Sequence, residues 1–399
     1  MTTDPDCASI LSAKVADITF GSPDTSGIDR DELYYRGQRI PCPGPSDDPP
    51  PPSSSVPTWL SRASALLRQD QVVAFPTETV YGLAGNALSA SAVRRIFAAK
   101  NRPADNPLIV HISSLAMLRT LLPDGRIPSV YEPLIRKYWP GPLTLLMPTS
   151  DLIIPSVITC GQPTVAIRFP AHPIARALIA YSGLPLAAPS ANSSGKPSPT
   201  LAQHVWTDLR QRIPLIVDGG QCDWGIESTV VDGLRLGQPT PVVPAILRPG
   251  GVTLEQIQQV PGFEQCQVYR KNFTDHRLEA APTTPGMKYR HYSPRAQVIL
   301  FEARPLNTST TTDPSSPASI AQPKGLVGDP ADDYATAHHQ TAQHPSPTSQ
   351  PSSKHLFRSF RDFDDLGVDY ILVEGTSERD EGLAVMNRLH KAASRTVYY

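Results

Sequence analysis

Several features that would assign a protein class directly are scarce or missing in this sequence. Its 399 residues include five cysteines, which are widely scattered and never spaced as CxxC. This spacing indicates neither a disulfide framework nor a zinc site, and a reducing compartment fits best. No run of 18 or more apolar residues occurs, and the first ten residues carry Asp4 and Asp6, where a transit peptide would be poor in acids. We therefore expect a cytoplasmic protein with no membrane partner.

The chain also lacks an excess of either charge and the familiar nucleotide-binding motifs. A formal net charge of -1 gives no global attraction to nucleic acid, so any RNA contact must come from a local patch. No GxGxxG follows a predicted strand, so a dinucleotide site is not expected. Residues 189–198 superficially resemble a P-loop, but Ser190 stands at the first glycine position and Pro197 follows Lys196. Small hydroxyl residues and backbone N–H groups in such a loop still suit a phosphate.

Proline, in contrast, is abundant, with 44 residues, about twice the usual share of ~5%. Many prolines fall in two low-complexity stretches, residues 41–57 and about 305–353, the second of which is also rich in Ser, Thr, Gln and His. Such compositions bury too little apolar surface to offset the entropy of ordering, which predicts a solvated extension and a largely mobile insert. Four histidines in or near the second stretch lack acidic or cysteine partners at ligand spacing, so no metal site is predicted there: His338, His339, His344 and His355.

Between these stretches the apolar pattern alternates between strand and helix. Leu60, Ala63 and Leu67 recur at i, i+3 and i+7, which predicts a helix after Pro57, and the apolar run 72–75 follows as a strand. Many strands are short and several links are too brief for a helical crossover, so we expect an α/β fold with a twisted mixed sheet and flanking helices. Further helices are predicted at 91–100, 114–122, 130–138, 173–181 and 201–211, and further strands at 108–112, 143–147, 165–169, 184–188, 215–218, 229–231 and 242–247.

A second, smaller α/β unit is predicted after Pro294. A strand at 298–301, a helix around 355–363, a strand at 370–374 and a helix at 382–393 have the required patterns. We therefore expect an N-terminal extension over 1–57 with a proline-rich end, a main domain over 58–270, a linker over 271–295 and a C-terminal α/β domain over 296–399 that carries the insert at about 305–353.

Chemically useful side chains concentrate in loops at strand ends. Residues 76–83 place two hydroxyls, a carboxylate and a phenol directly after a strand, although Thr and Tyr are also common there for structural reasons. Lys100 ends a helix, where a cation also serves as an ordinary dipole partner, whereas Arg102 lies in a turn that suits bidentate phosphate contacts. Other residues have purely structural interpretations as well. Arg168 can be read as a residue on the surface of a strand, His111 as a core histidine whose hydrogen bonds are satisfied, and Ser198 as the N-cap of a helix.

Seven motifs in one order resemble a known family. The ordered set is similar to the YrdC-like threonylcarbamoyl-AMP synthases over about residues 56–260, and PGMKYRHYSP (285–294) resembles the segment that joins this domain to the extra C-terminal domain of the two-domain branch. Residues 296–301 and 367–395 are similar to the edges of that second domain, which the resemblance makes Rossmann-like. The seven motifs are PTETVYGL, KNRP followed by NPL and a histidine, WPGPLTLL, VAIRFP, PSANSSGKPS, IESTVVD and LRPG.

The resemblance implies a function. Such an enzyme joins L-threonine, bicarbonate and ATP into threonylcarbamoyl-AMP and pyrophosphate, the first step of threonylcarbamoyladenosine formation next to the anticodon in tRNAs that read codons beginning with A. Positioning and charge stabilisation dominate this type of transfer, which agrees with the lack of a triad-like constellation. Mg²⁺ is expected with ATP, although its ligands are not visible in the sequence. The product is expected to pass to the threonylcarbamoyl transferase complex, and a contact with tRNA or double-stranded RNA is left open.

The resemblance also implies roles for individual residues. Lys100 and Arg102 correspond to paired cations for the ATP phosphates, and Tyr292 corresponds to a linker tyrosine that folds back over ATP. Arg168 would pair with the threonine carboxylate through two parallel hydrogen bonds. The implied ATP contacts are Arg102, Asn106, Thr164, Ser190, Ser198, Arg248 and Tyr292, and the implied threonine contacts are Thr79, His111, Arg168, Ala188 and Ser228.

Two functions of other classes are weighed against this hypothesis. An RNA-binding module would use a basic face formed by Arg94, Arg95, Lys100 and Arg102, but the neutral net charge and the lack of interleaved aromatic residues oppose it. A carbamoyl-transfer factor for hydrogenase assembly would carry zinc-finger and acylphosphatase-like segments, and the sequence shows neither.

Overall fold

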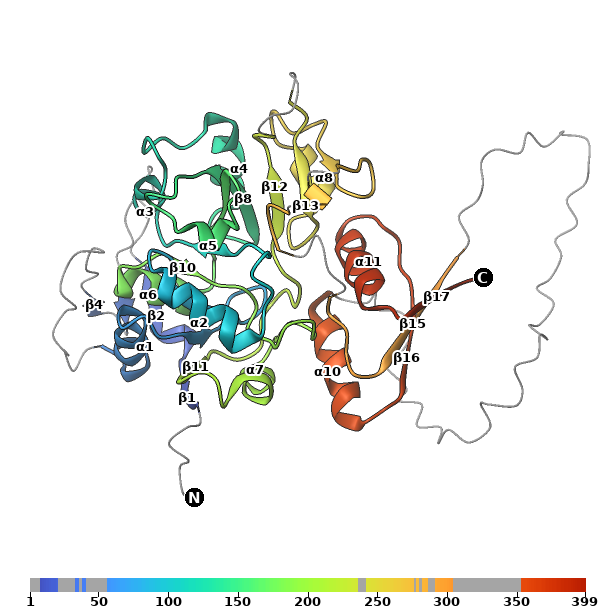
Figure 1. The fold of residues 1–399 in the computed structure, drawn as a ribbon, viewed down its shortest axis with the longest axis horizontal. Coiled ribbons are helices and arrows are strands. Elements are labelled where there is room, and N and C mark those ends of the chain that lie inside the picture. The colour runs from blue at the N-terminus through green and yellow to red at the C-terminus, as the bar shows by residue number, and fades with distance from the viewer. Residues whose placement is uncertain are drawn as a thin grey trace, which may run out of the picture.

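The computed structural model describes residues 8–20, 33–35, 38–40, 56–235, 242–275, 278–279, 282–285, 291–303 and 353–399. Most of these residues belong to one large unit, in which helices flank a sheet of eleven strands (Figure 1). In chain order the strands are β1 (Ser9–Ser12), β5 (Val73–Phe75), β6 (Gly82–Asn86), β7 (Ile109–His111), β8 (Leu143–Pro148), β9 (Thr164–Arg168), β10 (Leu186–Ala187), β11 (Leu215–Asp218), β12 (Thr229–Asp232), β13 (Ala245–Arg248) and β14 (Gln267–Val268).

The spatial order of this sheet is β1-β11-β5-β6-β10-β7-β9-β8-β12-β13-β14, with both parallel and antiparallel neighbours. For example, β7 pairs in parallel with β9, whereas β8 pairs antiparallel to β9. The predicted α/β class with a twisted mixed sheet is therefore confirmed.

Alternation along the strands gives the large sheet two buried faces. In β5, Val73 and Phe75 join one hydrophobic cluster, and Ala74 between them joins another on the opposite face. The first cluster includes residues of α1 (Thr58–Arg68) and α6 (Pro173–Ser182), together with two residues of the small antiparallel sheet β2 (Ile18–Phe20), β3 (Leu33–Tyr35) and β4 (Gln38–Ile40). The second includes residues of α2 (Ala90–Lys100), α3 (Leu115–Thr120), α4 (Glu132–Tyr138), α5 (Ser156–Thr159), α7 (Ala202–Leu209) and α8 (Leu254–Gln258).

Several strands are absent from the sequence-based expectation. β1 lies inside the predicted extension 1–57 yet pairs in parallel with β11, so the large sheet begins well before residue 58. β6, with the sequence GLAGN, carries two glycines that hide its strand pattern. A Cβ on Gly82 would lie 3.0 Å from the Phe75 ring, so this position needs the close backbone approach that glycine permits. The low-complexity stretches 41–57 and about 305–353 lie outside the described residues, except for residues 56, 57 and 353.

The C-terminal residues form a second α/β unit. Strands β15 (Gln297–Glu302), β16 (Tyr370–Glu374) and β17 (Arg395–Tyr398) make a parallel sheet in the order β16-β15-β17. Helices α10 (Leu356–Leu366) and α11 (Glu381–Ala392) lie between this sheet and the larger unit (Figure 1). Val80 and Ile226 of the larger unit belong to the same hydrophobic cluster as the C-terminal residues. The two units therefore share a buried core at their junction.

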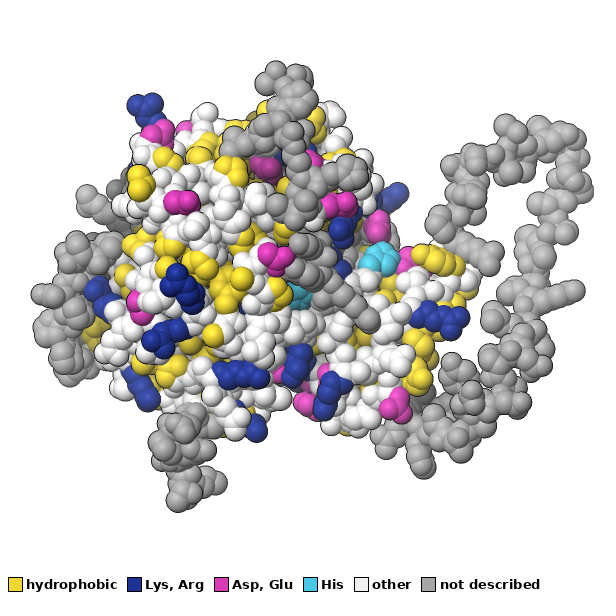
Figure 2. All heavy atoms as spheres, viewed as in Figure 1, with side chains coloured by type: hydrophobic (Ala, Val, Ile, Leu, Met, Phe, Trp, Pro, Cys, Tyr) yellow, Lys and Arg dark blue, Asp and Glu magenta, His cyan; other side chains and the backbone are white. Residues whose placement is uncertain are grey.

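Figure 2 shows exposed Lys and Arg side chains scattered over one face of both units among acidic and apolar groups. Such a mixture gives no single-sign patch on the visible face. Within the described part of the chain, no helix has the length and apolar character needed to cross a membrane.

Candidate functional site

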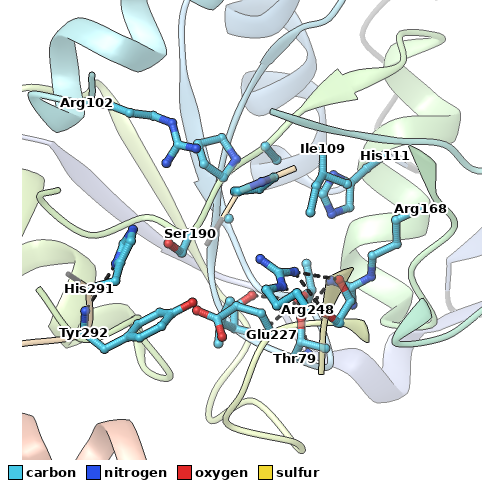
Figure 3. A pocket seen from close by; sticks show the side chains of 17 residues that line it. Thr79, Arg102, Ile109, His111, Arg168, Ser190, Glu227, Arg248, His291 and Tyr292 are labelled. Atoms are coloured by element: carbon cyan, nitrogen blue, oxygen red, sulfur yellow. Dashed lines mark hydrogen bonds between the residues drawn. The ribbon is translucent and has the colours of Figure 1, made fainter. Parts of the chain in front are cut away.

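A cavity opens at the ends of several strands of the large sheet, where the loops that follow or precede these strands meet the linker to the C-terminal unit. Its volume is about 50 Å³, below the ~300–1,000 Å³ usual for small-molecule sites, so its lining must move apart when substrates of that size bind. The lining comes from segments far apart in the sequence: 77–82 after β5, Arg102 after α2, β7, the end of β9, 188–190 after β10, 227–228 before β12, the end of β13, and 285 with 291–292 in the linker. Figure 3 shows Arg102 and His291 toward one end, Arg168 and His111 toward the other, and Arg248 with Glu227 between them.

Arg168 is held rigidly at one end of the cavity. Its Nη2 donates to Glu78 Oε1 at 2.7 Å and its Nη1 donates to Thr79 Oγ1 at 2.8 Å. A third, longer bond runs from Nε to the carbonyl oxygen of Gly141 at 3.4 Å. An arginine has five N–H donors, so these contacts leave two for a ligand. A buried guanidinium with two free donors is suited to bind a carboxylate.

Glu78 supplies the counter-charge that allows Arg168 to be buried. Burial alone would raise the pKa of Glu78, but the charge and hydrogen bond of Arg168 hold it below the ordinary glutamate value. The other carboxylate oxygen accepts from the backbone N–H of His172 at 3.3 Å. Glu78 therefore stays anionic and orients Arg168, and it is not available as a proton carrier.

His111 faces the same end of the cavity as a neutral ring. Burial, followed by the nearby charge of Arg168, lowers the pKa of His111 to about 3. Among the described residues, its Nδ1 has no hydrogen-bond partner. The ring therefore offers a neutral, unsatisfied nitrogen to a ligand, which differs from the satisfied core histidine considered above.

Arg248 and two hydroxyls form the floor between the two ends. The Arg248 Nη2 donates to the backbone oxygen of Ser228 at 3.0 Å and to its Oγ at 3.1 Å. The Ser228 Oγ also lies 2.8 Å from Thr144 Oγ1, and both side chains are fully buried. These hydrogen bonds hold the Ser228 hydroxyl in place, where it can select a ligand by hydrogen bonding.

Arg102 and Lys100, predicted as a pair of phosphate cations, have different surroundings. Arg102 lines the cavity and donates to the backbone oxygens of Asn106 at 3.2 Å and Pro107 at 2.9 Å. Lys100 does not line it: its ammonium donates to the backbone oxygens of Ser190 and Asn192, beneath the 189–198 loop. Burial and then the charge of Arg102 lower the pKa of Lys100 well below its ordinary value. In this structure Lys100 supports the loop, and Arg102 alone of the pair faces the cavity.

The linker closes the cavity on the side of the C-terminal unit. The Tyr292 ring is buried and stacks on Phe357 of α10, with centroids 5.0 Å apart. Its hydroxyl points toward the Glu227 carboxylate (Figure 3). Burial and the charge of Glu227 raise the pKa of Tyr292 to about 12, so the phenol keeps its proton. The backbone of Tyr292 has φ +65°, the left-handed region, so this turn directs the ring inward.

Nine of the thirteen residues predicted for substrates line this cavity. They are Thr79, Arg102, His111, Arg168, Ala188, Ser190, Ser228, Arg248 and Tyr292. The other four, Lys100, Asn106, Thr164 and Ser198, do not line it. The side chain of Ser198 donates to Glu227 at 2.6 Å and the N-cap of α7 is Leu201, so the N-cap alternative for Ser198 is wrong. Arg168 is buried, so its surface-strand alternative is also wrong.

Sequence reasoning did not assign some residues that line the cavity. Glu227 and His291 stood inside the motifs IESTVVD and PGMKYRHYSP, but neither was given a role. Thr77 and Ile109 also line it, and their types carry no signal that separates them from ordinary strand residues.

The basic face imagined for an RNA-binding module does not exist. Arg94 and Arg95 are exposed on α2, whereas Lys100 and Arg102 are buried. Two buried and two exposed cations do not make one surface for a phosphate backbone, so these four residues do not support an RNA-binding module.

Comparison with known proteins places the chain in a family. A family model described as "Telomere recombination" matches residues 65–250, and one described as "Threonylcarbamoyl-AMP synthase, C-terminal domain" matches residues 252–394. The chain is 45% identical to a threonylcarbamoyl-AMP synthase of Schizosaccharomyces pombe over 86% of this chain and 90% of that protein. It is also 45% identical to one of Pyrococcus abyssi over 84% of this chain and 94% of that protein.

A solved structure agrees with these matches. The crystal structure of P. abyssi Sua5 complexed with L-threonine superposes with a TM-score of 0.67 at 40% identity, covering 85% of this chain and 96% of that one. The matches extend over both α/β units and the linker, and the cavity lies where they meet. The chain therefore belongs to the threonylcarbamoyl-AMP synthase family.

Proposed function

We propose that this chain is an ATP-using nucleotidyltransferase that converts L-threonine, bicarbonate and ATP into threonylcarbamoyl-AMP and pyrophosphate. The observation that carries the proposal is the cavity with buried arginines at both ends and in the middle, Arg102, Arg168 and Arg248. A carboxylate and a triphosphate are both anionic, and one cavity with separate cationic ends suits a reaction that joins them.

The two ends suit different substrates. L-threonine would lie with its carboxylate on the two remaining donors of Arg168, beside the neutral His111 and the hydroxyl of Thr79. Ala188 and Ser228 would contact the rest of the amino acid. ATP would place its phosphates near Arg102, Ser190 and Arg248, under the Tyr292 ring. Asn106, Thr164 and Ser198 would then act behind the lining residues rather than in direct contact.

The chemistry suits a cavity without a free acid or base. The threonine amine adds to the carbon of bicarbonate, and water is lost together with the ammonium proton to give a carbamate; a carbamate oxygen then attacks the α-phosphorus of ATP, and pyrophosphate leaves. His111 is neutral at physiological pH and both oxygens of Glu227 accept hydrogen bonds, so neither is poised to move a proton. Catalysis would come from holding the reactants in line and from stabilising charge on the phosphates, with Arg102 and Arg248 as the main contributors.

Mg²⁺ is proposed as a companion of ATP, without a dedicated protein site. Among the described residues, no group of three or more His, Cys, Asp or Glu side chains could hold a metal ion. Glu227 lines the cavity, but its oxygens already accept from Ser198 and Arg388. The donor set therefore fits an ion carried mainly by phosphate oxygens and water, which is common for magnesium with nucleotides.

The later fate of the product is a proposal that rests on the family resemblance. We propose that the labile adenylate passes to the threonylcarbamoyl transferase complex that modifies tRNA, in the cytoplasm. A direct contact of this chain with tRNA or double-stranded RNA stays an open prediction.

The test is an assay of the complete reaction. Purified full-length protein is incubated with ATP, bicarbonate and labelled threonine, and threonylcarbamoyl-AMP and pyrophosphate are quantified. We expect equimolar formation of both that requires all three substrates. Pyrophosphate release that ignores threonine and bicarbonate, or no adenylate at all, would overturn the proposal. Arg168→Met is the matched variant: it should no longer bind threonine or form threonylcarbamoyl-AMP, while it still binds ATP.

A further inference from the structure

Arg388 connects the C-terminal unit to the cavity although it does not line the cavity itself. It lies on α11 and is the largest of the fully buried side chains. Its Nε donates to Glu227 Oε2 at 2.9 Å and its Nη1 donates to the Pro249 oxygen at 2.7 Å. Its Cζ lies 5.5 Å from the centre of the Tyr292 ring. One side chain of the second unit thus contacts three segments that surround the site.

Glu227 needs this partner because it is a carboxylate in a cavity proposed for a triphosphate. Its other oxygen accepts from Ser198, in the loop that follows β10. A carboxylate facing ATP would repel it, and one buried without a counter-charge would be strongly destabilised. Arg388, which does not line the cavity, supplies the ion pair to Glu227. Arg248 also acts on this carboxylate by its charge, and the guanidinium groups of Arg102 and Arg168 make no ion pair with it.

We propose that Arg388 is a positioning residue for ATP: it holds Glu227, and through it Ser198 and Tyr292, in the arrangement that receives the nucleotide. The inference rests on the proposed function, because it names the residue through which the C-terminal unit takes part in that reaction. Threonine binds at the opposite end of the cavity, on Arg168, so the effect is confined to ATP.

The chain offers a matched control for simple attachment of the two units. Arg358 on α10 also crosses the junction, and its Nη1 donates to Gln221 Oε1 at 2.8 Å. Neither Arg358 nor Gln221 lines the cavity. If Arg388 only attached the units, the loss of either arginine would have the same consequences.

The pH dependence gives a readout that attachment alone does not change. Burial by itself would raise the pKa of Glu227, but Arg388, then Arg248 and the Ser198 hydroxyl lower it to about 2. Without Arg388 this pKa rises. The uncompensated carboxylate then repels ATP at neutral pH, and because Glu227 becomes protonated as the pH falls, the loss of ATP binding is largest at high pH and smaller toward acid pH. The charged and titratable groups that act on Glu227 or feel its charge are Arg388 and Lys391 from α11, Arg248 from β13, and His291 and Tyr292 from the linker.

The experiment compares Arg388→Met, Arg388→Lys and Arg358→Met in the full-length chain, with the KM for ATP and the KM for threonine measured from pH 5 to pH 8. For Arg388→Met we expect the KM for ATP to rise at least tenfold at pH 8, and less toward pH 5, while the KM for threonine changes less than about twofold. Arg388→Lys should recover part of the loss, and Arg358→Met should leave the ratio of the two KM values unchanged. In Glu227→Gln/Arg388→Met, which removes both charges, the pH dependence of the loss should disappear.

Equal rises in both KM values, or the same pattern in Arg358→Met, would overturn the inference. So would a KM for ATP in Arg388→Met that matches the unaltered chain. If Arg388→Met does not fold, the ATP-specific loss must appear in Arg388→Lys or in the double variant, and its absence from both counts against the role. Activity of the unaltered chain is measured alongside. An inactive unaltered chain refutes the proposed function. An active unaltered chain whose KM values do not change in the Arg388 variants refutes only this inference.

Discussion

The buried Glu227 should make a measurable and pH-dependent contribution to stability. The ordinary pKa of this group is 4.5, and in the folded chain it is held at about 2. Because one pKa unit corresponds to ~1.4 kcal/mol, the charged network around Glu227 contributes about 3 kcal/mol to the free energy of unfolding at neutral pH. Since the folded pKa is the lower one, this contribution is complete above pH 4.5 and disappears as the pH falls toward 2.

The variant that isolates the effect is Glu227→Gln, which keeps the shape and removes the charge. Urea unfolding of both proteins is followed at pH 7, 5, 4 and 3. We expect the unaltered chain to be more stable by about 3 kcal/mol at pH 7 and pH 5, with a difference that shrinks at pH 4 and again at pH 3. Glu264→Gln, at an exposed position, shows what the loss of one surface charge does. A difference for Glu227→Gln that stays constant over the whole range would refute the reasoning.

Three further predictions concern the substrates. Arg102→Ala should lose most pyrophosphate release but only about 1–2 kcal/mol of stability, because the side chain donates just to two carbonyls of its own turn; a fully active variant in the pyrophosphate assay would contradict its phosphate role. The unaltered chain should prefer threonine to valine by at least ~10-fold in kcat/KM, and Thr144→Val, which removes the hydroxyl 2.8 Å from Ser228, should lower that ratio; an unchanged ratio would show that this pair does not read the substrate. Tyr292→Phe, which keeps the ring stacked on Phe357, should retain most ATP affinity in a binding titration, whereas Tyr292→Ala should bind ATP more weakly and release more free AMP per threonine consumed; identical behaviour of the two would exclude a role for the ring.

The parts of the fold with strong local patterns could be predicted from the sequence. The helix at α1 was found because its apolar residues repeat at helical spacing, and β11 was found because a short apolar run is bounded by turn residues. β1 could not be found, since the strand Ser9–Ser12 has only an alternating, half-exposed pattern and owes its structure to pairing with β11. β6 was hidden by its two glycines, which its packing requires: Gly82 lies against Phe75 and Gly85 against Ile96.

The site shows the same division between local and long-range information. Motif resemblance selected Arg102, Arg168 and Arg248, which face the cavity, but it also selected Lys100, whose ammonium turns away to the 189–198 loop. The direction of a side chain depends on neighbours distant in sequence, and no spacing rule reveals it. Arg388 could not be found either, because its partner Glu227 lies 161 positions away and only the docking of the C-terminal unit brings the two together.

This docking changes how the role of the linker must be tested. A truncation after Ala281 would remove Tyr292 together with the whole C-terminal unit, as a test of whether the linker is a lid or a passive tether. The structure shows otherwise, because Val80 and Ile226 of the larger unit are buried in the cluster formed by the C-terminal residues. The truncation would expose both, and it would also leave Glu227 without Arg388. A loss of ATP affinity in the truncated chain would therefore mix three causes. In the full-length chain, Tyr292→Phe keeps the ring on Phe357 and Tyr292→Ala removes only that one ring from the junction, so comparing the two separates the ring from the rest of the C-terminal unit.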